Sequence, residues 1–149
     1  MMKKLIDSII QKHRKDGIDV YPPATLSKIA DFEKEIGFDL PKNFKEFYLI
    51  SDGFYCNEDL FKMIPISEMR GYPKDYGDNW FYFSEYMIYS DMWGIRYTPS
   101  GKYEIFNGSY PDKTMTSSLV EFLEKFLQGN VFEKGGLRVD YMTGMKKLE

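Results

Sequence analysis

Residues 29–54, IADFEKEIGFDLPKNFKEFYLISDGF, decide the fold of this chain because they encode two helices and the turn that follows them. The first helix is expected to begin after Thr25, whose side chain suits an N-cap, and to end at Gly37, which supplies a C-terminal stop. Pro41 suits the first turn of the second helix, where its missing N–H is harmless, and apolar side chains then recur at i, i+3, i+4 and i+7. Asp52-Gly53 turns the chain. The stretch therefore predicts two helices joined by a tight connection.

Two further helices are expected outside this stretch. Residues 2–15 place apolar side chains at helical spacing, and Ser118 with Glu121 forms a capping box that opens a helix ending at Gly129. From residue 54 onward the sequence changes to short aromatic and β-branched runs separated by Gly, Pro, Asn and Asp. Five runs predict strands: Phe61–Ile66, Trp80–Phe83, Met87–Ser90, Ile95–Thr98 and Lys102–Phe106.

The connections complete the predicted architecture. Residues 99–101 are typical of a hairpin, whereas 67–79 is too long and polar for a tight turn and predicts an exposed loop or a short helix. The tail, 130–149, contains one candidate edge strand, 137–142. No strand–helix alternation of a parallel sheet is present. We therefore expect a single α+β domain over 1–149, with a central twisted antiparallel sheet of about five to six strands packed by N-terminal helices and a C-terminal helix.

Composition restricts the class of protein. Of the 149 residues, 43% are hydrophobic and 17% aromatic, which is ample material for one core. A net charge of −3 disfavours direct nucleic-acid binding, and the acid excess is concentrated in 52–96, with eight acids against four bases. The lone Cys56 forms no internal disulfide, and no run approaches the roughly 18 to 20 apolar residues of a membrane-spanning helix. We expect a cytoplasmic protein that does not enter membranes.

The sequence offers no obvious catalytic group. His13 is the only histidine, in a lysine-rich helix end, and is expected to be a partly exposed helix residue. Cys56 lacks an obvious base, and its acidic neighbours would raise its pKa. The acid pairs Asp75 with Asp78 and Glu58 with Asp59 are typical of solvated surface. We therefore expect no enzymatic activity, no cofactor and no metal.

The helix pair resembles a known family. Phe32-Glu33 is similar to an aromatic–Glu pair, Leu40-Pro41 to a Leu-Pro helix start, Phe44 and Phe47 to two buried positions, and Asp52-Gly53 to an Asn-Gly turn, with Asp in place of Asn. These are motifs of the SUKH superfamily (Smi/Knr-like domain), and the resemblance covers roughly residues 20 to 128. It implies helices around a twisted antiparallel sheet and, in bacteria, an immunity protein that neutralises the toxin domain of a polymorphic toxin system. The alternative that it implies is an intracellular scaffold or regulatory module of the cell-wall-regulator type.

The expected partner is a cognate toxin domain, with a nuclease as the case that an acidic surface would suit best. Recognition is expected around the 67–79 loop and the adjoining strand ends, where acids lie beside aromatic residues that serve as interface anchors. The candidate partner-binding residues are Tyr72, Asp75, Tyr76, Asp78, Trp80, Asp91 and Trp93. The alternative interpretation is that these acids only keep the protein soluble and that the tryptophans belong to the core.

Overall fold

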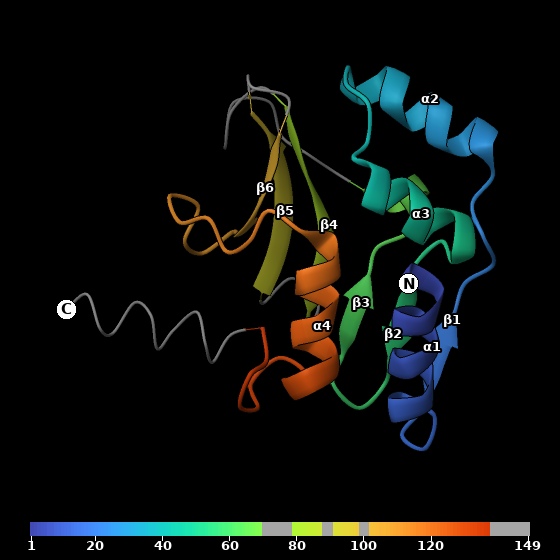
Figure 1. Ribbon diagram of the computed structural model, residues 1–149, viewed down its shortest axis with the longest axis vertical. Coiled ribbons are helices and arrows are strands. Elements are labelled where there is room, and N and C mark those ends of the chain that lie inside the picture. The colour runs from blue at the N-terminus through green and yellow to red at the C-terminus, as the bar shows by residue number, and fades with distance from the viewer. Residues whose placement is uncertain (70–78, 88–90, 99–101, 138–149) are drawn as a thin grey trace.

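The computed structural model describes residues 1–69, 79–87, 91–98 and 102–137 (Figure 1). Three helices and three short strands make up most of the first half, and three longer strands precede the last helix. The elements are α1 (Met2–His13), β1 (Ile18–Val20), α2 (Leu26–Ile36), α3 (Lys42–Ile50), β2 (Phe54–Cys56), β3 (Phe61–Met63), the 3-10 helix η1 (Ile66–Glu68), β4 (Trp80–Tyr86), β5 (Asp91–Tyr97), β6 (Tyr103–Asn107) and α4 (Leu119–Gly129).

The strands form one sheet in which every neighbouring pair is antiparallel. The order is β1-β2-β3-β4-β5-β6, so the six strands follow one another across the sheet as they do along the chain. Helices α1, α3 and α4 lie over one face, which we call the inner face (Figure 1). The structure thus confirms the predicted α+β class and the antiparallel sheet.

The predicted helix signals have the expected geometry. The Thr25 hydroxyl accepts a hydrogen bond from the Lys28 amide at 3.1 Å, and the Ser118 hydroxyl accepts one from the Glu121 amide at 3.2 Å. Gly37 has a φ of 84°, in the left-handed region that a C-terminal stop requires. These caps satisfy backbone groups that a helix end leaves unpaired, which explains why the boundaries of α2 and α4 fall close to the predicted ones.

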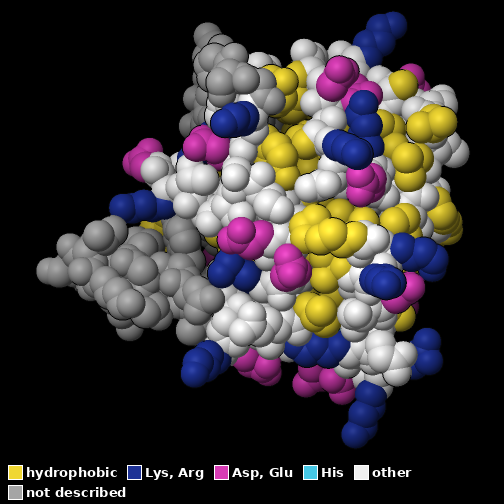
Figure 2. Space-filling view, viewed as in Figure 1, with side chains coloured by type: hydrophobic (Ala, Val, Ile, Leu, Met, Phe, Trp, Pro, Cys, Tyr) yellow, Lys and Arg dark blue, Asp and Glu magenta, His cyan; other side chains and the backbone are white. Residues whose placement is uncertain are grey.

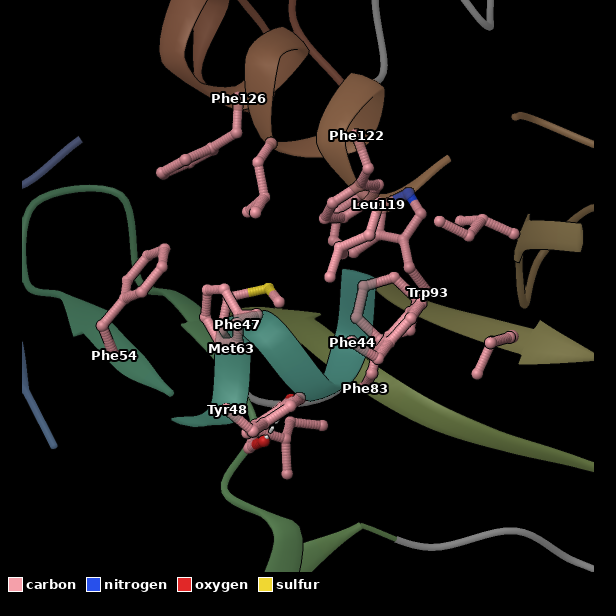
Figure 3. Packing of buried hydrophobic residues seen from close by; sticks show 14 of the residues in the cluster. Phe44, Phe47, Tyr48, Phe54, Met63, Phe83, Trp93, Leu119, Phe122 and Phe126 are labelled. Carbon is pink, nitrogen blue, oxygen red and sulfur yellow. Dashed lines mark hydrogen bonds between the residues drawn. The ribbon is translucent and has the colours of Figure 1, made fainter. Parts of the chain in front are cut away.

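The core lies between the inner face of the sheet and the helices. Phe122 and Phe126 of α4 point toward the sheet, and Phe44 and Phe47 of α3 meet them from the neighbouring helix (Figure 3). Phe126 stacks on Phe61 with ring centroids 4.0 Å apart. Full burial of such rings stabilises a fold by about 1.5–3 kcal/mol each. Helices α3 and α4 therefore supply much of the core.

A β-bulge in β4 changes which side chains reach each face. Tyr82 pairs with Gly94, but the next pair is Ser84 with Trp93, so Phe83 is an extra residue. Phe83 contacts Phe44 and Phe122 on the inner face. Ser84 also faces inward, because its cross-strand neighbours belong to the core. The residue after the bulge, Glu85, therefore points to the outer face.

Some predicted strands differ from the observed ones. β1 and β2 were not predicted, and β5 runs over 91–97 where a later start at Ile95 was expected. Met87 lies in a turn with a φ of 50°, so the predicted strand Met87–Ser90 does not begin there; residues 88–90 lie outside the described part. Of the candidate edge strand 137–142, only Leu137 is described, and it is buried.

Candidate functional site

The structure separates the predicted partner-binding residues into two groups. Tyr72, Asp75, Tyr76 and Asp78 lie outside the described residues. The other three are beneath the surface: Trp93 is fully buried, Trp80 is 5% exposed and Asp91 is 4% exposed.

Each buried residue has a structural environment that explains its position. Trp93 packs between Phe61 and Phe122, with ring centroids 6.0 and 5.9 Å away, so it belongs to the core. Trp80 lies edge-on to Tyr82 at 5.0 Å on the outer side of the sheet. The Asn107 side-chain amide donates a hydrogen bond to the Asp91 carboxylate at 3.3 Å. Trp93 is therefore a core residue, as the alternative interpretation of the sequence had it, and its side chain is not available to a partner in this structure.

The described part of the chain places a different group of side chains around η1, which begins the predicted 67–79 loop. Two residues at the end of α3 hold this segment from beneath. The Tyr48 hydroxyl donates a hydrogen bond to the Ile64 carbonyl at 2.8 Å, and the Asp52 carboxylate accepts one from the Ile66 amide at 2.9 Å. Both contacts are buried. The helix pair that determines the fold therefore also positions η1.

The turn before β2 requires a glycine because the backbone has a positive φ there and lies close to the neighbouring strand. Gly53 has a φ of 101°, and a Cβ at this position would lie 2.1 Å from the carbonyl oxygen of Met63. The chain of β2 therefore passes directly against the segment that leads into η1. A side chain at residue 53 would push the two apart.

Beside η1, the outer face of the sheet carries a row of polar side chains. Antiparallel register places Asp19 opposite Tyr55, Tyr55 opposite Lys62, and Lys62 opposite Glu85. The Lys62 ammonium donates to the Glu68 carboxylate of η1 at 2.9 Å. One tyrosine, two carboxylates and one lysine therefore lie together on neighbouring strands.

Partial burial affects the pKa values of two side chains in this row. Burial raises the pKa of Glu85, and the positive charge of Lys62 opposes the shift. Burial also opposes the charge of Lys62, but its hydrogen bond to Glu68 and the surrounding carboxylates outweigh this effect and raise the pKa of the lysine. Lys62 thus stays charged at neutral pH, hydrogen-bonded to Glu68 and opposite Glu85 on the neighbouring strand.

On the other side of η1 is a hollow of about 190 Å³ beneath α2. The residues that line it are Lys28, Asp31, Phe32, Glu35, Ile66, Ser67 and Met69. Because η1 borders both the hollow and the polar row, we treat them as one continuous surface, the η1 surface. It comprises the lining residues of the hollow together with Asp19, Tyr21, Tyr55, Lys62, Glu68 and Glu85.

The η1 surface differs in charge from the helical face. Its five carboxylates and two lysines give a net charge of −3. The face that carries α1, α3 and α4 instead shows acidic and basic side chains interspersed with apolar ones (Figure 2). An acidic surface with half-buried tyrosines is suited to binding a basic protein partner.

The position of His13 corrects the expectation from the sequence. His13 is 3% exposed, its ring stacks on Phe126 at 5.1 Å, and its Nδ1 lies 3.4 Å from the Asp59 carboxylate. The expectation of a partly exposed residue was wrong because His13 continues the buried face of α1, whose earlier members include Ile9. Burial lowers the pKa of His13, although the charge of Asp59 opposes the shift.

This environment is unsuited to acid–base chemistry on a substrate. The Nε2 of His13 is buried beside the Asn130 side chain, so no substrate atom can reach it in this conformation. Cys56 is also fully buried, and burial raises the pKa of its thiol, with the charge of Asp59 adding to the shift. A buried protonated thiol is a poor nucleophile.

The described residues contain neither a metal-binding cluster nor a membrane-spanning helix. Within residues 1–69, 79–87, 91–98 and 102–137, no group of three or more His, Cys, Asp or Glu side chains could hold a metal ion. In the same ranges, no helix has both the length and the apolar content needed to cross a membrane. The η1 surface is the candidate site that the described residues present.

Comparison with known proteins places the chain in a family. The family model for SMI1 / KNR4 (SUKH-1) matches residues 23–135, which include α2, α3, all strands after β1, and α4. None of the curated proteins matches the chain. The matched region includes the helix pair and the η1 segment that it positions. The chain belongs to the SMI1 / KNR4 family (SUKH-1).

Proposed function

We propose that this chain is an immunity protein that binds the toxin domain of a cognate bacterial polymorphic toxin and neutralises it by occlusion, without catalysis, in the cytoplasm. The observation that carries the proposal is membership of the SUKH-1 family over 23–135. Burial of His13 and Cys56, the two side chains best suited to acid–base or nucleophilic chemistry, supports a binding role.

The η1 surface supplies a physical mechanism for neutralisation. A toxin that acts on nucleic acid must present a basic groove to phosphate, and an acidic surface competes for that groove. The net charge of −3 on the η1 surface would also speed encounter with a basic partner, by electrostatic steering that salt weakens. Tyr21 and Tyr55 would then provide aromatic contact area at the interface. The predicted contribution of Tyr72, Asp75, Tyr76 and Asp78 remains part of this proposal.

The experiment uses the toxin domain that the proposal expects a neighbouring gene to encode. Co-expression should restore growth of cells that carry the toxin, and the purified proteins should form a complex that inhibits toxin activity. Absence of both effects would contradict the proposal.

A matched pair of variants then tests the surface. Asp19→Lys with Glu68→Lys reverses two exposed charges of the η1 surface, whereas Asp112→Lys with Glu124→Lys makes the same change in net charge at exposed positions elsewhere. The first variant should slow association about tenfold at low salt, and the second should change it much less. Equal effects of the two variants would mean that only net charge matters and that the partner binds elsewhere.

The alternative function is an intracellular scaffold or regulatory module, because the family name also covers KNR4-type regulators. The two functions predict different genetic neighbours. A neighbouring gene for a secreted protein with a variable C-terminal domain favours the immunity role. A partner that is an endogenous protein, recovered with the chain as bait and unable to harm the cell, favours the regulatory role.

A further inference from the structure

The hollow between α2 and η1 has an apolar floor. Phe32, Ile66 and Met69 line it, and each is buried within the protein over most of its surface. Its volume is about 190 Å³. For comparison, an apolar cavity of about 150 Å³ is large enough to take up benzene. One leucine, methionine or phenylalanine side chain would therefore fit into the space.

The floor is held in place from below. The ring of Phe32 packs edge-on against Phe81 of β4, with centroids 5.0 Å apart. Ile66 is fixed through its amide, which donates to Asp52 at 2.9 Å, and the Met69 amide donates to the Ile66 carbonyl at 3.3 Å. Met69 adds an unbranched side chain that adapts to the shape of a ligand. The hollow is therefore formed before a ligand arrives, which reduces the entropy lost on binding.

The rim of the hollow carries two carboxylates that have no partner among the described residues. Asp31 and Glu35 are exposed and lie one helical turn apart on α2, so both carboxylates line the same edge. In the described part of the chain, neither carboxylate makes a hydrogen bond or an ion pair. Lys28 is the only basic residue among those that line the hollow. Ser67, which is small and exposed, leaves the opposite edge open.

We infer that this hollow binds one large apolar side chain of a protein partner, and that a lysine or arginine next to that side chain pairs with Asp31 and Glu35. The inference rests on the proposed function and adds the chemistry of the partner: a basic segment with a protruding apolar residue. The apolar anchor supplies contact area inside the hollow, and the basic neighbour supplies charge complementarity at the rim. An acidic segment of a partner would be repelled by the carboxylates at the rim, and a purely polar segment would have no side chain to fill the apolar hollow.

The first test does not depend on the toxin. Three peptides, acetyl-Arg-Leu-Arg-amide, acetyl-Arg-Ser-Arg-amide and acetyl-Asp-Leu-Asp-amide, are titrated into the ¹⁵N-labelled full chain and followed by NMR. The first peptide should shift the amide signals of Ser67 and Met69 in a saturable manner, and the other two should shift them several-fold less. Equal shifts with the serine peptide would overturn the anchor, and no shift with the leucine peptide would overturn the inference as a whole.

The second test fills the hollow with a side chain and compares the result with a matched control variant. Ser67→Trp places a ring into the space, whereas Ser27→Trp places the same ring on an exposed part of α2 that does not line the hollow. Thermal unfolding establishes that both variants are folded. Ser67→Trp should abolish the peptide shift at Met69 and lower toxin affinity at least tenfold, and Ser27→Trp should do neither.

The two proposals fail in distinguishable ways. If the wild-type chain binds the toxin but Ser67→Trp binds it equally well, the anchor is wrong and the immunity role stands. If the wild-type chain binds no toxin, the immunity role is wrong, and the peptide titration decides the chemistry of the hollow by itself.

Discussion

Replacement of Asp52 tests whether the fold-determining helix pair also holds the η1 surface. The Asp52 carboxylate accepts a hydrogen bond from the Ile66 amide at 2.9 Å, and both residues are at least nine-tenths buried. A hydrogen bond to a charged group contributes about 1.5–3 kcal/mol, and an orphaned buried donor costs a similar amount. Asp52→Ala should therefore lower the free energy of unfolding by about 2 kcal/mol. For a chain of this length, that corresponds to a fall in melting temperature of roughly 4–8 °C.

Asp52→Asn is the matched control, because the asparagine side chain keeps an acceptor oxygen at the same place. It should cost less than about 1 kcal/mol, which also fits the resemblance to a family turn that carries Asn at this position. Urea unfolding measures both variants, and hydrogen exchange at the Ile66 amide should quicken in Asp52→Ala alone. A loss below about 0.5 kcal/mol for Asp52→Ala, or an equal loss for Asp52→Asn, would show that this hydrogen bond does not hold η1.

Three further predictions concern the core and the buried cluster. Phe47→Ala should lower the free energy of unfolding by about 3 to 5 kcal/mol, since this ring is fully buried, and a loss below about 1 kcal/mol in urea unfolding would contradict its role. His13 should titrate by NMR below the ordinary histidine pKa of about 6.5, and Asp59→Asn should lower its pKa further by removing the charge that opposes the shift. Because the unfolded chain then binds the proton more readily, stability should fall as the pH drops below about 6.5, and His13→Gln should remove that part of the decline. The Cys56 thiol should resist alkylation in the folded protein and react after unfolding in urea; rapid reaction under native conditions would show that this region opens.

Local signals were sufficient to predict the helices from the sequence. α2 and α4 have capping hydroxyls at Thr25 and Ser118, and their apolar faces repeat at helical spacing. The strands were harder to predict because their limits depend on contacts between distant residues. β1 is only three residues long, Ile-Asp-Val, which is too short for its alternation to indicate a strand. In β5, Gly94 resembles a strand breaker, yet a Cβ there would lie 2.8 Å from the ring of Phe106 on the next strand.

The candidate site was less predictable, because it depends on the β-bulge. Alternation along Phe61-Lys62-Met63 is enough to place Lys62 on the outer face. For β4, strict alternation from Phe81 would turn Glu85 inward, and only the extra residue at Phe83 turns it outward, beside Lys62. A bulge of this kind has no signature in a single sequence. The acidic loop was predicted as a binding region from its composition, but the hollow next to it depends on how α2 packs against η1.

The arrangement around η1 separates the residues that hold the segment from those that a partner would contact. Tyr48 and Asp52 bind its backbone from the buried side, through the Ile64 carbonyl and the Ile66 amide. Ser67 and Glu68 are exposed, and neither takes part in those two hydrogen bonds. Substitutions at these two positions should therefore change stability by only about 0.5 kcal/mol while altering the charge and shape that a partner meets. One scaffold can in this way present different recognition surfaces, because the two buried hydrogen bonds that hold η1 do not involve the side chains of Ser67 and Glu68.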